Sequence, residues 1–386
     1  MTRIAIVNRS IDGFGAATTT IIETTRGFAK IGWEVHLYAE HLDEERIRQA
    51  GGIGHPLPRW PWGSYFKRRL FDWLLERAIR GIKFDLICGN GDILSQDILI
   101  LHNCVHAAHE AIYGNPLPEN SGVGRIHKHI LSGRRFRHMI ANSEMMKREV
   151  VERFGVPAEM VTVVHPGYDP VQFRPEDREA LGGPIRRELG LKREDILVGL
   201  ITSGDFKKRG VSILLGAVGR LTSEIQAKLH VLIMGKETRL GLYRRLAQRA
   251  GLGTRGHFLP PASQVQRYYH ALDLFAFPAL YEEFGQSIQE TLACGVPVLS
   301  SDRVGAAEFI RGPERELMTE KPEEEAFSRR LATLITQPEL RKRMALAGIA
   351  ACRHNTWEEN FKRWRACYES LLLKTKSDPP PSSLPL

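Results

Sequence analysis

The sequence contains no long hydrophobic run. No window of about eighteen consecutive apolar residues occurs, so a membrane-spanning helix is not expected. The first residues, Met-Thr-Arg-Ile-Ala-Ile-Val-Asn, have too short an apolar run for a signal peptide and predict a β-strand instead. The 386 residues, of which 42% are hydrophobic and 26% charged, are typical of a globular protein. We therefore expect a cytoplasmic protein long enough for two domains.

Cysteine is scarce and scattered. The five cysteines form an odd set without C-x-x-C spacing, which indicates reduced thiols and argues against a zinc site. His106 and His109 are three residues apart and would share a helix face, as metal ligands do, but no acidic or cysteine partner stands at ligand spacing. We therefore predict no metal. The cysteines are Cys88, Cys104, Cys294, Cys352 and Cys367.

A dinucleotide fingerprint is also missing. The chain opens with a strand at Ile4–Val7, a glycine-bearing loop at 8–17, a helix at 18–30 and a second strand at 34–38. The loop reads D-G-F-G and not G-x-G-x-x-G, so this βαβ unit carries no signature for a dinucleotide. The glycines of the loop fit either a phosphate-binding turn or an ordinary tight turn between strand and helix.

Nucleic-acid-binding motifs are absent although the net charge is +9. The positive charge gathers in Arg59–Lys83, where it is mixed with aromatic residues, and in Arg125–Arg148, which holds seven Lys or Arg against one acid. Neither stretch belongs to a helix-turn-helix, RRM or zinc pattern, so no specific nucleic-acid partner is expected. An anionic membrane surface would suit both stretches, and a phosphorylated glycan would suit the second. The alternative is a solvated charged face in each case.

The most informative stretch is Pro278–Ser301. A loop with two carboxylates, Glu282 and Glu283, leads into a short helix that contains Glu290 and ends at a glycine. A glycine at the start of that helix would let backbone N–H groups approach a phosphate. Carboxylates beside a phosphate repel it, so these more readily accept hydrogen bonds from hydroxyls. The pattern fits a nucleotide sugar, with an ordinary loop, helix and buried strand as the alternative.

A second phosphate-binding pattern follows the strand predicted at 196–201. The sequence T-S-G-D-F-K-K-R-G places a glycine, three cations and a second glycine before a helix that starts at Val211. Backbone N–H groups and cationic side chains in such a loop neutralise a diphosphate.

Together these motifs resemble family 4 retaining glycosyltransferases. The resemblance rests on the seven residues between Glu282 and Glu290, on the S-G-D-F-K-K-R-G loop, and on A-N-S, H-P-G-Y-D and G-x-x-E elements at 141–143, 165–169 and 305–308. The loop is most similar to that of lipopolysaccharide-core glucosyltransferases. Three positions depart from the family: Glu283 replaces a frequent glycine, Gly204 stands where Arg is usual, and Arg209 takes the place of Lys.

The resemblance implies an α/β protein with two Rossmann-like domains facing each other across a cleft, the GT-B fold. Residues 1–170 would form the acceptor-side domain and 195–350 the nucleotide-sugar domain. Residues 351–373 would form a helix that crosses back to the first domain, and 374–386 a disordered tail.

The resemblance also implies roles for individual residues. Glu290 would bind the ribose hydroxyls and Glu282 the hexose hydroxyls, and Lys208 and Arg209 would stabilise the leaving diphosphate. A histidine, His102 or His106, would face the donor sugar, and we take His106 as the catalytic candidate. No cofactor is implied. The other candidates for donor binding are Gly13, Phe14, Gly15, Gly204, Phe258, Leu259, Phe284, Gly285, Gln286 and Ser287.

The function implied is the transfer of a hexose from a nucleotide sugar, most simply a UDP-sugar, to a glycan or glycolipid with retention. Lipopolysaccharide or other cell-surface polysaccharide synthesis, at the inner face of the cytoplasmic membrane, would be the setting. The alternative is a non-catalytic basic protein of the same fold that binds anionic lipid or nucleic acid. A UDP-sugar epimerase or a phosphorylase shares the fold, but would need a different acid pair or a pyridoxal lysine.

Overall fold

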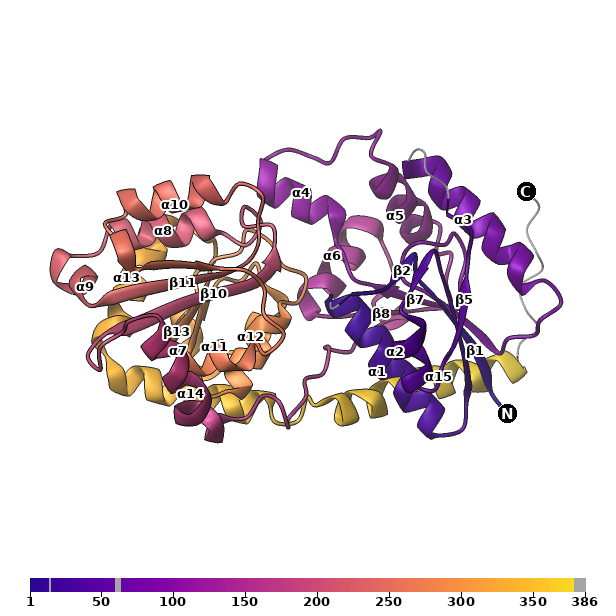
Figure 1. The fold of residues 1–386 in the computed structure, drawn as a ribbon. Helices are drawn as coiled ribbons and strands as arrows, with labels where there is room; N and C mark the ends of the chain where they lie inside the picture. The colour runs from indigo at the N-terminus through magenta and orange to yellow at the C-terminus, as the bar shows by residue number, and fades with distance from the viewer. Residues whose placement is uncertain (14, 60–63, 378–386) are drawn as a thin grey trace. The chain divides into compact units, whose positions relative to one another are not determined.

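The computed structural model describes residues 1–13, 15–59 and 64–377, which form two compact units (Figure 1). The first unit contains Met1–His106 and Pro116–Gly167 together with the chain from Trp357 onward. The second contains Ala107–Asn115 and Tyr168–Thr356. The main passage from one unit to the other therefore lies at Gly167, shortly before the boundary expected from the sequence.

The first unit is built on a seven-stranded sheet in which all paired neighbours run parallel. Its central strands are almost fully buried because helices cover a parallel sheet on both faces. In spatial order the strands are β5 (Ile53–Pro56), β3 (Glu34–Ala39), β1 (Arg3–Val7), β6 (Leu86–Gly89), β7 (Ile98–Leu101), β8 (His138–Ala141) and β9 (Val161–Val163).

The helices of this unit follow the strands in the order expected of βα units. A short two-stranded sheet, β2 (Ser10–Ile11) with β4 (His41–Leu42), lies beside them. The helices are α1 (Ala16–Lys30), α2 (Glu44–Gln49), α3 (Ser64–Ile79), α4 (Val105–Tyr113), α5 (Gly122–Ser132), α6 (Glu144–Phe154) and α15 (Trp357–Ser377). Helix α4 begins in the first unit, and its residues from Ala107 onward group with the second.

The last helix, α15, packs against α1 in the core of the first unit (Figure 1). The ring of Phe28 on α1 lies 5.1 Å from that of Phe361 and 4.6 Å from that of Tyr368, both on α15. A Cβ atom at Gly27 would meet the Phe361 ring at 2.2 Å, so the two helices require glycine there. The final helix is thus part of the first unit's core.

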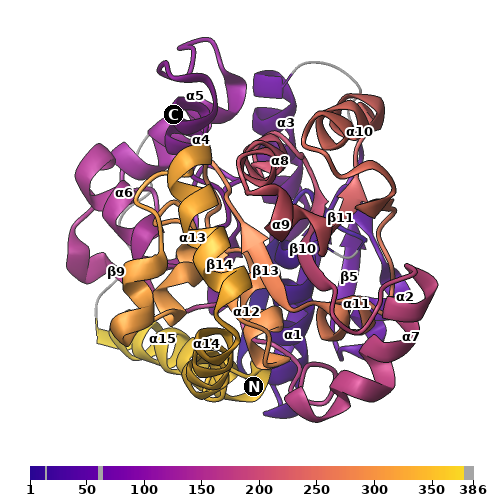
Figure 2. The same ribbon diagram turned by 90° about the vertical axis from the view of Figure 1, so that its left-hand side faces the viewer.

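The second unit contains a five-stranded parallel sheet of the same kind. Its strands in spatial order are β12 (Gly256–Leu259), β11 (Leu229–Lys236), β10 (Ile196–Gly204), β13 (Leu274–Phe277) and β14 (Val298–Ser300). In Figure 1, α8 and α10 lie above β10 and β11, and α7, α11, α12 and α14 lie below; Figure 2 shows the same layers end-on. The helices are α7 (Gly183–Glu188), α8 (Val211–Gly219), α9 (Ser223–Ala227), α10 (Leu240–Arg249), α11 (Gln266–Ala271), α12 (Gln286–Ala293), α13 (Glu324–Thr336) and α14 (Pro338–Cys352).

The C-terminal region contains two successive helices and a tail whose predicted start needs correction. Pro338, which lacks an N–H donor, starts α14 after α13 has ended at Thr336. The start predicted for the disordered tail, residue 374, is too early, because α15 continues through Ser377. The remainder of that tail lies outside the described residues.

Within the described ranges, no helix combines the length and the apolar character needed to cross a bilayer. The same residues contain no cluster of three or more His, Cys, Asp or Glu side chains placed to hold a metal ion.

Candidate functional site

The site is organised around the N-terminus of α12. Gly285 precedes the helix with φ +91°, a left-handed conformation that favours glycine, and an added Cβ would lie 3.0 Å from a Val304 methyl group. Gln286 and Ser287 form the first turn, where backbone N–H groups and the helix dipole favour an anion. Gly295, with φ +72°, ends the helix as expected.

The Glu290 carboxylate, on α12, accepts a hydrogen bond from a residue that was not predicted from the sequence. The Tyr269 hydroxyl on α11 donates a hydrogen bond of 2.9 Å to Glu290 Oε2. Burial raises the pKa of Glu290 to about 7, although the hydrogen bonds from Tyr269 and Gln286 act in the opposite direction. The carboxylate is thereby fixed in orientation. No sequence spacing relates Tyr269 to this site, because the contact joins separate helices.

Glu282 lies in the loop that follows β13 and is fixed through its backbone. Its N–H donates to the Arg303 carbonyl at 2.9 Å, and its carbonyl accepts from Gly305 N at 3.0 Å. Its carboxylate forms an ion pair with Arg209, and both side chains are largely buried. Burial raises the pKa of the Glu282 carboxyl, whereas the charges of Arg209 and Lys208 oppose that shift.

Glu283, which departs from the family pattern, pairs with the neighbouring cation. Its Oε2 atom lies 2.8 Å from Lys208 Nζ, and Glu283 is buried. Consecutive carboxylates therefore face consecutive cations: Glu282 contacts Arg209, and Glu283 contacts Lys208. The four groups carry no net charge in total.

The cations lie beside these carboxylates because two loops approach closely. Gly210 has φ +71°, and a Cβ atom there would lie 1.8 Å from the Pro278 carbonyl oxygen, so only glycine fits. Asp205, with φ +54°, accepts a hydrogen bond from Lys208 N at 3.1 Å and shapes the turn. Gly204 is the last residue of β10 and not a loop residue, since the strand is three residues longer than predicted.

Lys207, the first cation of the loop, has a different environment. Its Nζ atom lies 4.1 Å from the centre of the Tyr113 ring, at the end of α4. This cation–π contact makes Tyr113 a further neighbour of the loop that the sequence did not indicate.

Three of the predicted donor-binding side chains, those of Phe258, Leu259 and Phe284, pack in or against the core of the second unit. Phe284 is buried, with its ring 6.2 Å from that of Phe309, so it would reach a ligand through its backbone. Phe258 and Leu259 lie in β12, an edge strand that pairs with β11 among the described strands of the second sheet. An edge strand leaves backbone groups available on its outer side.

The remaining candidates belong to the first unit. Gly13 has φ +73° and Gly15 caps α1, whereas Phe14 lies outside the described residues. His106, on α4, has its ring 5.3 Å from that of Phe154. His102 follows β7, and its Nε2 atom lies 2.8 Å from Asn90 Oδ1. The structure thus pairs Glu282 with Arg209 and places Lys208 on the adjoining Glu283, and the ligand-binding roles of all the candidates stay predictions.

Comparisons with known proteins agree with this arrangement. Residues 184–350 match the family described as glycosyl transferases group 1, and residues 17–172 match Glycosyltransferase Family 4. The D-inositol 3-phosphate glycosyltransferase of Rhodococcus opacus is 30% identical over 241 residues, which cover 61% of this chain and 52% of the relative. The enzyme of the same name from Nocardia farcinica matches to the same extent. The chain thus spans about half the length of the curated relatives it matches.

Two solved structures show the same fold. WaaG, a glycosyltransferase involved in lipopolysaccharide biosynthesis, superposes with a TM-score of 0.80 at 16% identity, over 95% of this chain and 99% of that one. HepE from Anabaena, in complex with UDP and glucose, superposes with a TM-score of 0.77 at 18% identity, over 96% and 100%. These likenesses confirm the predicted α/β fold with two Rossmann-like units.

Proposed function

The chain belongs to the glycosyltransferases of family 4 and group 1, and on that premise we propose that it transfers a hexose from a UDP-sugar to a hydroxyl group of a glycan or glycolipid. The transfer proceeds with retention at the sugar carbon. Neither a metal ion nor a cofactor takes part.

The observation that carries this proposal is the grouping of two carboxylates and two cations beside the N-terminus of α12. Lys208 and Arg209 provide positive charge for a diphosphate, together with the N–H groups at the start of the helix. Glu290, eight residues after Glu282, is separated from it by the Gly285 turn. A ligand with hydroxyl groups on both sides of a diphosphate satisfies all of these groups, and a nucleotide sugar has that chemistry.

The proposed reaction breaks the bond between the hexose and the diphosphate. As the diphosphate leaves, its charge grows, and Lys208, Arg209 and the helix N-terminus stabilise it more strongly than the intact donor. The acceptor hydroxyl attacks the same face of the sugar and passes its proton to the departing diphosphate. Glu282 holds the hexose hydroxyls during this step, and Glu290 holds the ribose.

The names of the relatives support a UDP-hexose donor and a role in cell-surface polysaccharide synthesis. HepE has been solved with UDP and glucose, and WaaG takes part in lipopolysaccharide biosynthesis. The curated relatives are named for a phosphorylated polyol acceptor. A UDP-hexose donor and an acceptor of a cell-surface polysaccharide pathway, used in the cytoplasm, accord with these names.

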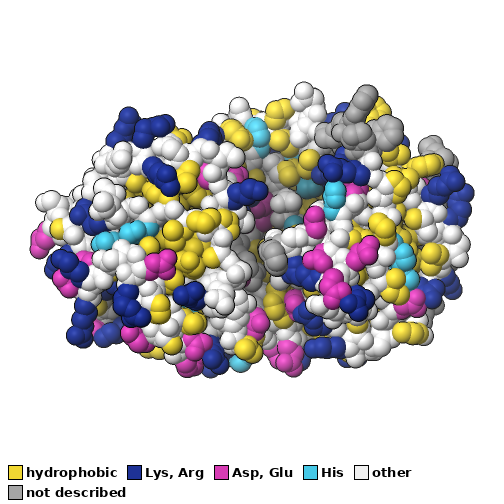
Figure 3. Space-filling view, viewed as in Figure 1, with side chains coloured by type: hydrophobic (Ala, Val, Ile, Leu, Met, Phe, Trp, Pro, Cys, Tyr) yellow, Lys and Arg dark blue, Asp and Glu magenta, His cyan; other side chains and the backbone are white. Residues whose placement is uncertain are grey.

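We further propose that the first unit binds the surface of an anionic membrane. Helix α3 exposes Phe66 and Trp73, at 77% and 51%, and the Arg77 guanidinium lies over the Trp73 ring. Aromatic and basic side chains on one exposed face suit the boundary of an anionic bilayer. Figure 3 shows Lys and Arg among hydrophobic side chains at the edge where α3 lies in Figure 1.

The basic stretch Arg125–Arg148 contributes only some of its cations to the proposed membrane-binding surface. Its exposed cations are Arg125, Lys128, Arg134, Arg135 and Arg148. Lys147 donates to the Val161 carbonyl, and His127 is buried, so these two residues serve the fold. Helices α3 and α5 pack together, which places the exposed cations of α5 on an element adjoining α3.

The test is to incubate the full chain with a panel of nucleotide sugars and a membrane extract as the acceptor source, and to measure the release of nucleoside diphosphate. We expect release from a UDP-hexose and its loss in Glu290→Gln. Glu325→Gln, which alters an exposed carboxylate on α13, is the matched control and should leave release unchanged. Release from no donor would overturn the proposed activity.

A further inference from the structure

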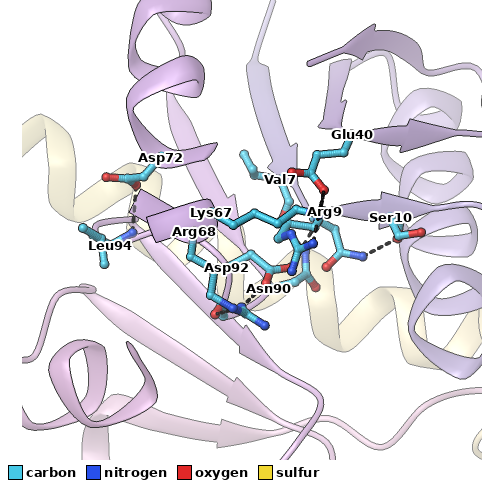
Figure 4. Close-up of polar contacts among 12 residues, drawn as sticks. Val7, Arg9, Ser10, Glu40, Lys67, Arg68, Asp72, Asn90, Asp92 and Leu94 are labelled. Carbon is cyan, nitrogen blue, oxygen red and sulfur yellow. Dashed lines mark hydrogen bonds and ion pairs between the residues drawn. The ribbon is translucent and has the colours of Figure 1, made fainter. Parts of the chain in front are cut away.

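A second polar cluster lies at the carboxyl ends of strands in the first unit (Figure 4). Arg9 follows β1, Glu40 follows β3 and Asp92 follows β6. The strand order reverses between β1 and β6, and doubly wound sheets bind ligands outside the carboxyl ends at that point. Lys67 and Arg68, neighbours on α3, reach the same place.

The contacts within this cluster link each cation to a carboxylate. Arg9 Nη2 lies 3.2 Å and Lys67 Nζ 3.3 Å from the same Glu40 oxygen. Arg9 N donates to Asp92 Oδ2 at 3.1 Å, and the Arg68 guanidinium forms an ion pair with Asp92. The carboxylates thereby hold the three cations in place on two strand ends and one helix.

The cluster carries one uncompensated positive charge. Three cations face two carboxylates, and Glu40 is only 2% exposed, whereas Arg9 and Lys67 are 26% and 16% exposed. The nearby His127 adds no charge, because burial lowers its pKa to about 3 and the charge of Arg68 adds to that effect. The accessible part of the cluster is therefore positive.

Hydrogen-bond donors also remain unused. Among the described residues, Arg9 Nε has no hydrogen-bond partner. The Lys67 ammonium carries three protons, and Glu40 is its one recorded partner in the described part of the chain. Unused donors around a fixed positive charge are what an anionic ligand requires.

From this geometry we propose that the cluster binds the anionic group of the acceptor: a phosphate or carboxylate carried by a sugar or polyol. The buried carboxylates limit the net charge to one, which favours a ligand with a single anionic group. The assignment of this ligand as the acceptor rests on the proposed function, whereas binding of the anion does not.

The test is calorimetric titration of the donor-free full chain with glucose 6-phosphate, glucuronate and glucose. We expect the anionic sugars to bind and glucose to bind at least about tenfold more weakly. Lys67→Met should weaken glucose 6-phosphate binding about tenfold or more, and Lys67→Arg should restore most of it. Arg69→Met, which removes an exposed charge from the same helix outside the cluster, is the matched control and should bind as the unaltered chain does.

Two further measurements distinguish a lipid-borne anion from a soluble one, and anion binding by the cluster from donor binding. Vesicles containing phosphatidylinositol test a lipid-borne headgroup, and competition by soluble glucose 6-phosphate assigns their binding to this cluster. UDP titration of the same samples tests the donor site independently and also shows whether each variant is folded, with Arg9→Gln as a second variant of the cluster. Equal anion binding in Lys67→Met and the unaltered chain, or no binding of any anionic probe by the unaltered chain, would overturn the proposal.

Discussion

Lys208 Nζ lies 2.8 Å from Glu283 Oε2, and the two side chains are only 15% and 5% exposed. The adjacent pair, Arg209 with Glu282, is similarly enclosed. The loop 204–210 therefore keeps its two cations Lys208 and Arg209 on neighbouring carboxylates. Under the proposed function, a donor diphosphate would have to share or displace those partners, and Glu283 would oppose its binding.

Glu283→Gln should accordingly strengthen donor binding. The substitution keeps a hydrogen-bond acceptor near Lys208 and raises the net charge of the four groups from zero to +1. We expect UDP to bind about three- to tenfold more tightly at low salt, and the gain to shrink as salt screens the added charge. Titration with UDP at two salt concentrations checks this, with Glu325→Gln as the control. Weaker UDP binding in Glu283→Gln would show instead that Glu283 positions Lys208 for the donor.

Donor binding should depend on pH through Glu290. Its pKa of about 7 means that the carboxylate, the form that accepts hydrogen bonds from two ribose hydroxyls, is lost as the pH falls through 7. UDP affinity should fall in the same range. Tyr269→Phe removes a hydrogen bond that favours the ionised form, so the midpoint should move to higher pH. A UDP titration series from pH 5.5 to about 8.5 checks both expectations. A midpoint that does not move in Tyr269→Phe would contradict this role of the tyrosine.

Glu290→Gln should stabilise the fold while it removes activity. The pKa of Glu290 is raised from 4.5 to about 7 in the folded state, so the folded protein holds the proton more tightly than the unfolded chain does. This contribution to the free energy of unfolding is complete below pH 4.5 and is lost as the pH rises to 7. Above that range, ionisation of the half-buried carboxyl costs on the order of 3 kcal/mol, which a neutral amide avoids. Urea unfolding at pH 5 and pH 8 should show a gain of about 1–3 kcal/mol for Glu290→Gln at pH 8 and a smaller gain at pH 5. A gain that is equal at both values would exclude ionisation as its source.

Gly210→Ala should damage the phosphate loop. A Cβ atom would lie 1.8 Å from the Pro278 carbonyl, and φ is +71°, so the loop must move away from the carboxylates. We expect a loss of at least about 1 kcal/mol in the free energy of unfolding and of at least about tenfold in UDP affinity. Gly241→Ala in α10, where a Cβ meets only a side-chain nitrogen at 3.7 Å, is the control and should be neutral or slightly stabilising. Unchanged UDP affinity in Gly210→Ala would show that the loop does not contact the diphosphate.

Trp73→Ser should weaken binding to anionic vesicles. An indole that is 51% exposed on α3 would lose its apolar contact with the bilayer boundary, which corresponds to a decrease of about tenfold in partitioning. Val171→Ser removes an exposed apolar side chain from the second unit and is the matched control. Reversal of the charges at Arg134 and Arg135 should reduce binding further at low salt. Vesicle sedimentation measures all of these, and equal binding of Trp73→Ser and Val171→Ser would remove α3 from the membrane contact.

The sequence predicted the parts of the fold that depend on local pattern. The buried strands at 4–7, 34–38 and 196–201 and the helix N-terminus at Gly285 were recognisable because runs of apolar residues and glycines mark them directly. Strand β5 was missed because Ile53-Gly-His-Pro56 contains two residues that disfavour strands. The edge of a sheet tolerates them.

The candidate site was predictable in its members but not in its pairings. Glu282, Lys208 and Arg209 were expected to contact a ligand, and the structure shows that they also contact each other or Glu283. Tyr269 was missed because its hydrogen bond joins separate helices. Contacts of this kind depend on how the elements pack, for which a single sequence contains no signal.

The packing of α15 into the first unit has a consequence for the order in which the protein takes shape during synthesis. Phe361 and Tyr368 complete the core beside α1, and they leave the ribosome after every residue of the second unit has been made. Synthesis of the first unit therefore begins before that of the second unit and is completed after it. Until then the nascent chain lacks the helix that packs on Phe28 and the rest of the apolar face of α1, so a fragment ending at Gly167 should be aggregation-prone.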